Sequence, residues 1–167
     1  MTILRMYYTP ESVQRPTHYR EAWWEEDTGE FVLHHGKVGE PGTTTVEHVS
    51  DSTEADLLLA SFAQHNATEG YIDVEELTQE QFRVLIRYRG SDPTQAEQTN
   101  AEKFAREYTG LLGWRGLGDI AQWNEDHALA AFVFHIEAVH RAKAAKYAAE
   151  AIKQTDFRAD RMKIERT

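Results

Sequence analysis

This sequence has no cysteine and no long apolar run. Without cysteine the chain can form no disulfide bond and has no thiolate nucleophile. No apolar stretch approaches the length that crosses a bilayer, and residues 1–5 lack the basic stretch followed by an apolar core that marks a secretory signal. We therefore expect a cytoplasmic protein that makes no contact with a membrane.

Positive charge is scarce in the first half of the chain. Residues 1–78 hold four Lys/Arg against 15 Asp/Glu, a net charge of -11, whereas residues 79–167 hold 14 against 13, a net charge of +1. Affinity for nucleic acid rests on neutralising phosphates with Lys and Arg, so the first half disfavours that ligand. An acidic surface attracts basic proteins, although acidity also simply keeps a protein in solution. We expect a protein partner.

Motifs of known catalytic and metal sites are also lacking. The glycine-rich run 113–118 follows a predicted helix and lacks the Gly-Lys-Ser/Thr ending of a phosphate loop, so it is typical of a tight helix-to-strand connection. His34 and His35 are adjacent in a predicted strand and point to opposite faces, and His135 and His140 have a poor spacing for metal ligands. There is no Gly-x-Ser-x-Gly motif. We predict no enzyme activity, no metal and no cofactor.

The first half predicts strands followed by one helix. Alternating and β-branched segments separated by Gly and Pro predict four strands, and apolar residues at helical spacing predict a helix with Ser50, Asp51 or Ser52 as N-cap. The strands are expected at 3–8, 18–25, 30–38 and 43–49, and the helix at 52–67 with an apolar face of Ala55, Leu58, Leu59, Phe62 and Ala63.

The second half predicts the order β-α-β-β-α-β, the ferredoxin-like supersecondary pattern, with both helices on one face of a four-stranded antiparallel sheet. Expected elements are strand 81–88, helix 94–112, a strand ending at 123, a hairpin turn at 124–127, strand 128–136, helix 137–154 and strand 160–165. The helices are expected to bury the stripes Ala96, Phe104, Tyr108, Leu111, Leu112 and Val139, Ala142, Ala145, Ala149, Ile152. The fold class is α+β, with domains at 1–76 and 80–167 joined by a short link at about 73–80.

Several features of the first half occur together in one known family. They are the aromatic strand 19–24, the turn at Gly29, the spacing of Gly36, Gly39 and Gly42 after a strand, and Gly70-Tyr71 after the helix. Over residues 1 to about 75 the chain resembles the WGR domain family. The resemblance implies an antiparallel sheet with one helix and, from the domain's place in poly-ADP-ribose polymerases, contact with DNA ends or neighbouring domains. The three positions that name the family read His35-Gly36-Lys37 here.

Five residues are candidates for partner contact: Trp24, His35, Lys37, Trp114 and Arg115. Of Trp23 and Trp24, which face opposite ways in a strand, we expect one in the core and the other exposed. His35 and Lys37 occupy the family's motif positions. An Arg beside an exposed aromatic makes a good interface anchor, but Trp114 is equally consistent with a core position.

We therefore interpret the chain as a non-catalytic binding or regulatory protein of unknown ligand. One alternative is an acidic inhibitor or immunity-type protein that covers a basic toxin or nuclease. Another is a DNA-associated WGR-type module. The C-terminal stretch 141–167, with eight Lys/Arg against four Asp/Glu, can also dock on the acidic half, within a chain or between two copies, so a homodimer is compatible with the sequence.

Overall fold

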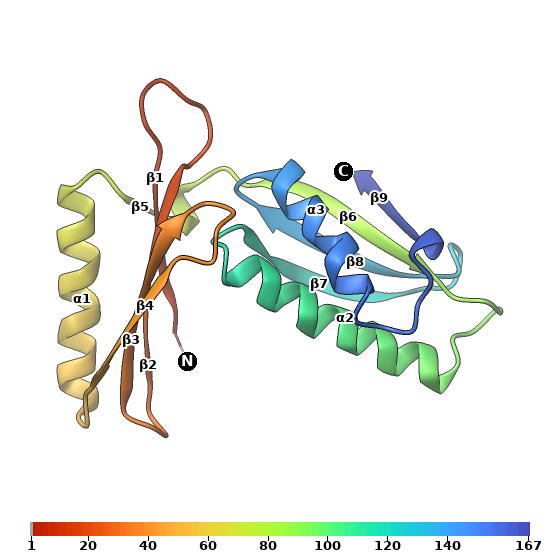
Figure 1. The fold of residues 1–167 in the computed structure, drawn as a ribbon, viewed down its shortest axis with the longest axis horizontal. Helices are drawn as coiled ribbons and strands as arrows, with labels where there is room; N and C mark the ends of the chain where they lie inside the picture. Colours follow the sequence, from red (N-terminus) through yellow and green to blue (C-terminus); the bar gives the residue numbers. More distant parts are fainter. Residues whose placement is uncertain (1) are drawn as a thin grey trace. The chain divides into compact units, whose positions relative to one another are not determined.

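A computed structural model describes residues 2–167, and the chain divides into two compact units, Met1–Thr78 and Gln79–Thr167. Each unit contains one antiparallel sheet, with strand order β4-β3-β2-β1-β5 in the first and β7-β8-β6-β9 in the second (Figure 1). The predicted α+β class is confirmed. Within residues 2–167, every helix is too short or too polar to cross a bilayer.

The first unit consists of a sheet and one long helix. Its elements are β1 (Leu4–Tyr8), β2 (His18–Glu25), β3 (Glu30–Lys37), β4 (Thr43–His48), α1 (Ser52–Thr68), β5 (Ile72–Asp73) and the 3₁₀ turn η1 (Val74–Glu76). The predicted strands and helix agree with these bounds to within one residue at each end. Of the three N-cap candidates it is Asp51 that caps α1, because its carboxylate accepts a hydrogen bond of 2.9 Å from the Thr53 amide.

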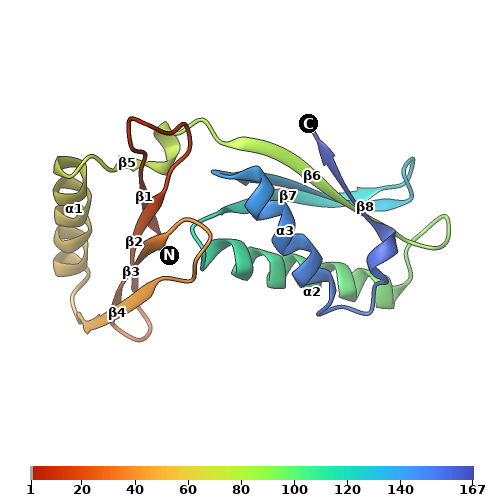
Figure 2. The same cartoon turned by 45° about the horizontal axis from the view of Figure 1, so that its top comes forward.

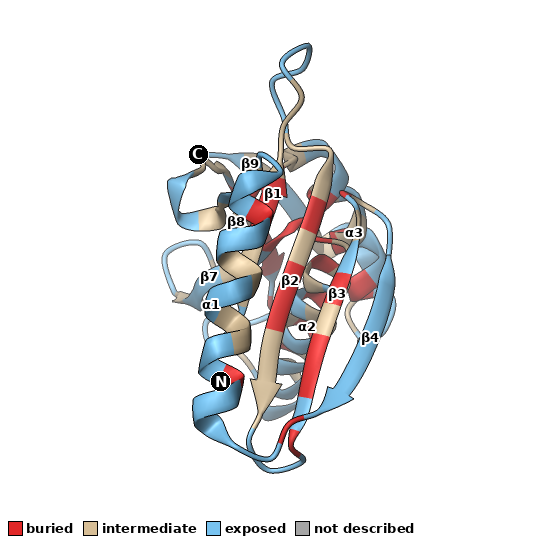
Figure 3. Cartoon of the chain, turned by 90° about the vertical axis from the view of Figure 1, so that its left-hand side faces the viewer, coloured by how far each residue is buried: buried red, intermediate tan, exposed pale blue. Residues whose placement is uncertain are grey.

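The core of the first unit lies between the sheet and α1. Ala22, Phe31, Val49 and Ala55 are buried there, and partly buried apolar side chains of β2, β3 and α1 pack around them. The predicted apolar face of α1 supplies Ala55, Leu58, Leu59 and Phe62 to this cluster. Figure 3 shows buried positions on β2 and β3, where neighbouring residues such as Glu21 and Ala22 are both buried although they point to opposite faces, whereas β4 is exposed along its whole length.

The predicted link between the two halves is partly structured. Residues 72–73 form β5, which pairs with Met6 and Tyr7 of β1 at the edge of the first sheet, and η1 follows directly. The first residues of the expected link at about 73–80 are therefore structured, and the boundary between the two units, at residues 78 and 79, lies within it. A strand of two residues is too short to show an alternating pattern, so only its pairing partner reveals it.

The second unit has the predicted element order. Its elements are β6 (Glu80–Arg87), α2 (Gln95–Gly113), β7 (Gly118–Asp126), β8 (Ala131–Ala138), α3 (Arg141–Ile152), the 3₁₀ turn η2 (Ala159–Arg161) and β9 (Met162–Arg166). Helices α2 and α3 lie side by side on one face of this sheet (Figures 1 and 2). The Tyr108 hydroxyl on α2 donates a hydrogen bond of 2.8 Å to the Ala144 carbonyl on α3, which joins the two helices inside the core.

Strand β6 carries the apolar face that the sequence predicts. Phe82, Val84 and Ile86 are buried on this face, and so is Tyr88, the residue directly after the strand. On neighbouring β8, Phe134 makes an edge contact with Phe104 of α2, with ring centroids 4.8 Å apart. The core of the second unit is therefore formed between the helix-covered face of the sheet and the two helices.

Three expectations for the second unit differ from the structure. The β7–β8 turn lies at 127–130 rather than 124–127, because Asn124, Glu125 and Asp126 pair with β8 despite their turn-forming character, and Asp126 caps the turn through the Leu129 amide. Helix α3 begins at Arg141, since residues 137–138 complete β8. Of the predicted stripe, Val139 and Ile152 are buried, but the buried alanines are Ala144, Ala148 and Ala151 rather than Ala142, Ala145 and Ala149. Alanine occurs all round α3, so apolar spacing does not distinguish its faces.

Gly36 and Gly42, two of the three glycines in the family-like motif, allow the segment after β3 to fold back closely. Gly42 has a φ of +69°, and a Cβ there would overlap the His35 carbonyl oxygen and lie 2.6 Å from the Tyr19 hydroxyl. At Gly36 a Cβ would lie 2.8 Å from the Cα of Gly42. The fold-back brings the Glu40 carbonyl to 2.7 Å from the Tyr19 hydroxyl, which donates to it.

Replacing Gly42 by Ala therefore tests this packing. We expect Gly42→Ala to lower the free energy of unfolding of the first unit by at least about 2 kcal/mol, because the cost of a left-handed backbone at alanine adds to the cost of the steric overlap. Urea denaturation followed by NMR resonances of each unit measures this loss. Gly110→Ala in α2, where an added Cβ meets nothing within 4 Å, is the control and should stabilise the second unit by about 0.5–1 kcal/mol. Equal unfolding midpoints for wild type and Gly42→Ala in the first unit would contradict the close approach.

Candidate functional site

The first unit has an acidic cleft at the end of β2, where the chain turns into β3 and passes the first turns of α1. Its volume is about 610 Å³. Four carboxylate side chains line it together with one tryptophan and one leucine; the lining residues are Thr2, Trp24, Glu25, Glu26, Asp27, Thr28, Asp56 and Leu59. We call this set the acidic cleft.

The apolar side of the acidic cleft is held in place by the core. Trp24 and Leu59 both pack against the buried cluster beneath α1. The indole N–H of Trp24 donates a hydrogen bond of 2.9 Å to the Val49 carbonyl, so the ring is fixed by packing and by its polar end. Trp24, a residue the sequence singles out, thus presents part of its ring to the cleft while it also completes the core. Both Trp23 and Trp24 are half-buried, so the expectation of one core and one exposed ring was wrong.

The charged side of the acidic cleft is uncompensated. Glu25 receives hydrogen bonds from the Trp23 indole at 3.3 Å and the Thr28 hydroxyl at 3.4 Å. Glu26, Asp27 and Asp56 are exposed, and among residues 2–167 none of them has an ion-pair partner. Carboxylates beside an aromatic ring attract Lys or Arg, since the cation gains from the charges and from the ring face. The arrangement suits a basic side chain with an apolar stem.

His35 and Lys37 do not join Trp24. Both are exposed near the end of β3 where His18 pairs with Lys37, whereas Trp24 pairs with Phe31 at the opposite end. Six residues along a strand span about 20 Å. The structure therefore separates the family's motif positions from the acidic cleft.

Trp114 and Arg115 lie in the second unit, at the end of α2. Trp114 is 49% exposed, which excludes a core position. The guanidinium of Arg115 stacks over the Tyr147 ring at 4.5 Å and donates to the Leu111 carbonyl at 3.3 Å, which ties the end of α2 to α3. The glycine-rich run around them is a tight helix-to-strand connection, as predicted, in which the Leu117 amide donates to the Leu112 carbonyl at 3.0 Å.

A buried charged row crosses the first sheet on the face opposite α1. Cross-strand register places Arg5 beside Glu21 and Glu21 beside His34. Arg5 Nε lies 2.5 Å from one Glu21 oxygen, and His34 Nδ1 lies 3.0 Å from the other. The second ring nitrogen of His34 faces the Pro41 carbonyl at 2.5 Å. Sequence reasoning places His34 on the face opposite His35 but misses its partners, because Glu21 is 13 residues away in the chain.

The row favours the charged form of His34. Both ring nitrogens face acceptors, so both hydrogen bonds form only when the imidazole carries two protons. Burial by itself lowers the pKa of His34, but the hydrogen bonds to Glu21 and to the Pro41 carbonyl outweigh it, and the pKa is raised above its ordinary value. Neither Glu21 nor His34 lines the acidic cleft. Among residues 2–167, no group of three or more His, Asp or Glu side chains is arranged to hold a metal.

Comparisons with known proteins give no family. No protein-family model and no curated protein matches this chain. One solved structure, of a Bacteroides fragilis protein determined in a structural genomics programme, aligns with a TM-score of 0.37 and 16% identity over 44% of this chain. The alignment spans only 19% of the Bacteroides protein, and a likeness this weak carries no argument about this chain.

The charged row predicts a pH dependence of the first unit. Because the pKa of His34 is raised on folding, its contribution to stability is complete below the ordinary value of about 6.5 and is lost as pH rises through the folded pKa. NMR titration of the His34 ring should give a midpoint above 6.5. Glu21→Gln should lower that midpoint and cost the first unit about 3 kcal/mol at pH 6, since it removes the carboxylate that Arg5 and buried His34 both contact. His35→Gln, on the other face, should leave the His34 midpoint unchanged. A His34 midpoint that Glu21→Gln does not move would refute the pairing.

Proposed function

We propose that this chain is a non-catalytic binding protein whose acidic cleft holds a basic segment of a protein partner. The observation that carries the proposal is the acidic cleft itself: a concave site of about 610 Å³ with an anchored tryptophan and three carboxylates that have no ion-pair partner among residues 2–167. Acidic side chains that only keep a protein in solution do not have to line a cavity beside a tryptophan ring held in place by the core.

The charge distribution supports the same partner chemistry. The first unit carries a net charge of -11. The negative field of this unit attracts a basic protein from a distance and speeds its association. The same field repels a phosphate backbone and so disfavours nucleic acid. An inhibitor or immunity-type protein that covers a basic toxin or nuclease is one form of this function.

The contacts of buried His34 favour a structural role for the charged row. A general base needs a ring nitrogen free to accept a proton. In this unit both ring nitrogens of His34 face acceptors, both Glu21 oxygens are engaged, and the Tyr19 hydroxyl donates to the Glu40 carbonyl. These groups therefore stabilise the sheet and the fold-back after β3.

A peptide titration of the full chain tests the proposal. We expect a lysine-rich octapeptide to shift the NMR signals of the Trp24 indole and of residues 25–28 and 56 saturably at about 50 mM salt, with weaker binding at about 500 mM salt because screening increases. An octaglutamate peptide should cause no shift.

Matched charge reversals locate the binding. Asp27→Lys with Asp56→Lys should weaken peptide binding at least about tenfold, or about 1.4 kcal/mol. Glu75→Lys with Glu76→Lys makes the same charge change on exposed residues outside the cleft and should weaken it far less. Equal losses in both variants would show that net charge, not the cleft, attracts the peptide. Retention of nicked or blunt-ended DNA on a filter at moderate salt would instead favour the DNA-associated function.

A further inference from the structure

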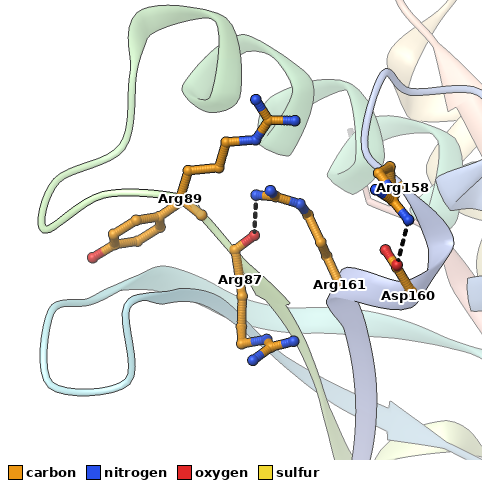
Figure 4. A pocket seen from close by; sticks show the side chains of 6 residues that line it. Arg87, Arg89, Arg158, Asp160 and Arg161 are labelled. Carbon is orange, nitrogen blue, oxygen red and sulfur yellow. Dashed lines mark hydrogen bonds and ion pairs between the residues drawn. The ribbon is translucent and has the colours of Figure 1, made fainter.

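The second unit brings together arginines from two distant parts of the sequence. Arg87 is the last residue of β6, and Arg89 lies two residues further along the chain. Arg158 directly precedes η2, and Arg161 is its last residue. Strand β9 pairs with β6, with Met162 opposite Ile86, and this pairing places residues 158–161 next to residues 87–89. The result is a hollow of about 350 Å³ lined by these four arginines with Tyr88 and Asp160, which we call the arginine hollow (Figure 4).

The arginines of the hollow differ in how they are held. Arg161 is mostly buried, donates to the Arg87 carbonyl at 3.3 Å and lies 3.6 Å from the Glu97 carboxylate. Arg158 is exposed, and its one ion pair among residues 2–167 is with exposed Asp160, at 2.8 Å. In Figure 4 the side chain of Arg89 extends toward that of Arg161, while Arg87 points away from both. The guanidinium of Arg89 has no hydrogen bond or ion pair among residues 2–167.

Nearby carboxylates leave this charge only partly compensated. Glu97 is committed to the N-terminus of α2, where it accepts from the Thr94 amide at 3.1 Å and from the Arg89 amide at 3.1 Å, besides its contact with Arg161. The Arg158–Asp160 pair is exposed to solvent, so it is weak and is easily exchanged for a stronger anion. Guanidinium groups gathered in one hollow repel one another, and a doubly charged anion relieves that repulsion.

A second hollow adjoins the first and adds an apolar wall. It shares Arg89, Arg158 and Arg161, has a volume of about 340 Å³, and is also lined by the half-buried ring of Phe157. Phe157 is held against Phe132 of the core, with ring centroids 6.2 Å apart. The three shared arginines therefore lie between the arginine hollow and a neighbouring hollow whose lining includes Phe157 together with the carboxylates of Glu97 and Asp156.

We propose that the arginine hollow binds a small phosphate monoester. Arg89, Arg158 and Arg161 donate to the phosphate oxygens, for which the planar guanidinium fork is well matched, and the ester substituent lies against Phe157. Phosphate is favoured over a carboxylate because three guanidinium groups supply more donors and more positive charge than one carboxylate can use.

NMR titration of the full chain with inorganic phosphate, phenyl phosphate and benzoate tests this proposal at about 150 mM salt, where non-specific attraction is screened. We expect saturable shifts at residues 87–89 and 157–161 for both phosphates, with phenyl phosphate the tighter ligand. If neither inorganic phosphate nor phenyl phosphate causes saturable shifts at these residues, the proposal is overturned. Benzoate binding as tightly as phenyl phosphate would overturn the preference for phosphate, and inorganic phosphate binding as tightly as its phenyl ester would overturn the role of Phe157.

Arginine variants provide the control. Arg89→Ala and Arg158→Ala each remove an exposed side chain and should weaken phenyl phosphate binding at least about tenfold without changing the fold. Arg106→Ala, an equal charge change at an exposed position of α2 outside both hollows, should leave the affinity within about twofold of wild type. Equal weakening by Arg89→Ala and Arg106→Ala would assign the shifts to overall charge and would reject the site.

Discussion

Cross-strand register decides which side chains of this protein meet. In the first unit, pairing of β1, β2 and β3 puts Arg5, Glu21 and His34 in one row across the sheet, and the same register sends Ala22, Trp24 and Leu33 toward α1. A shift of one residue would exchange the two faces and bring charged side chains into the helix-covered core. The buried row thus stabilises the register that creates it, because Arg5, Glu21 and His34 contact one another only when β1, β2 and β3 pair in this register.

The two candidate sites have opposite charge and depend on their frameworks in the same way. The acidic cleft forms where a hairpin of β2 and β3 reaches the first turns of α1. The arginine hollow forms where β9 returns beside β6. Most of the charged groups in both sites are exposed, whereas an aromatic side chain that packs on the core, Trp24 in the acidic cleft and Phe157 beside the arginine hollow, is half-buried. Such sites combine electrostatic attraction, which salt screens, with an apolar contact, which it does not.

Strong periodic patterns were interpreted correctly, and weak ones were not. The alternating strand 82–88 and the apolar face of α1 are visible in the sequence because one side of each element meets a core of large side chains. The β7–β8 turn was misplaced since backbone pairing with β8 overrides the turn preference of Asn124 and Asp126. The buried face of α3 was misassigned because alanines surround that helix, and short β5 is recognisable only beside β1.

By itself the sequence determined the α+β class, the order of the main strands and helices, and the concentration of acidic residues in the first half. These properties follow from local periodicity, turn chemistry and composition, which act between residues close in the chain. Only the tertiary structure decided that Asp56 faces the β2–β3 hairpin, that Glu21 pairs with His34, and that Arg158 and Arg161 join Arg89. Those contacts join residues far apart in sequence, and the strand pairing and helix packing that create them leave no mark in any short stretch of residues.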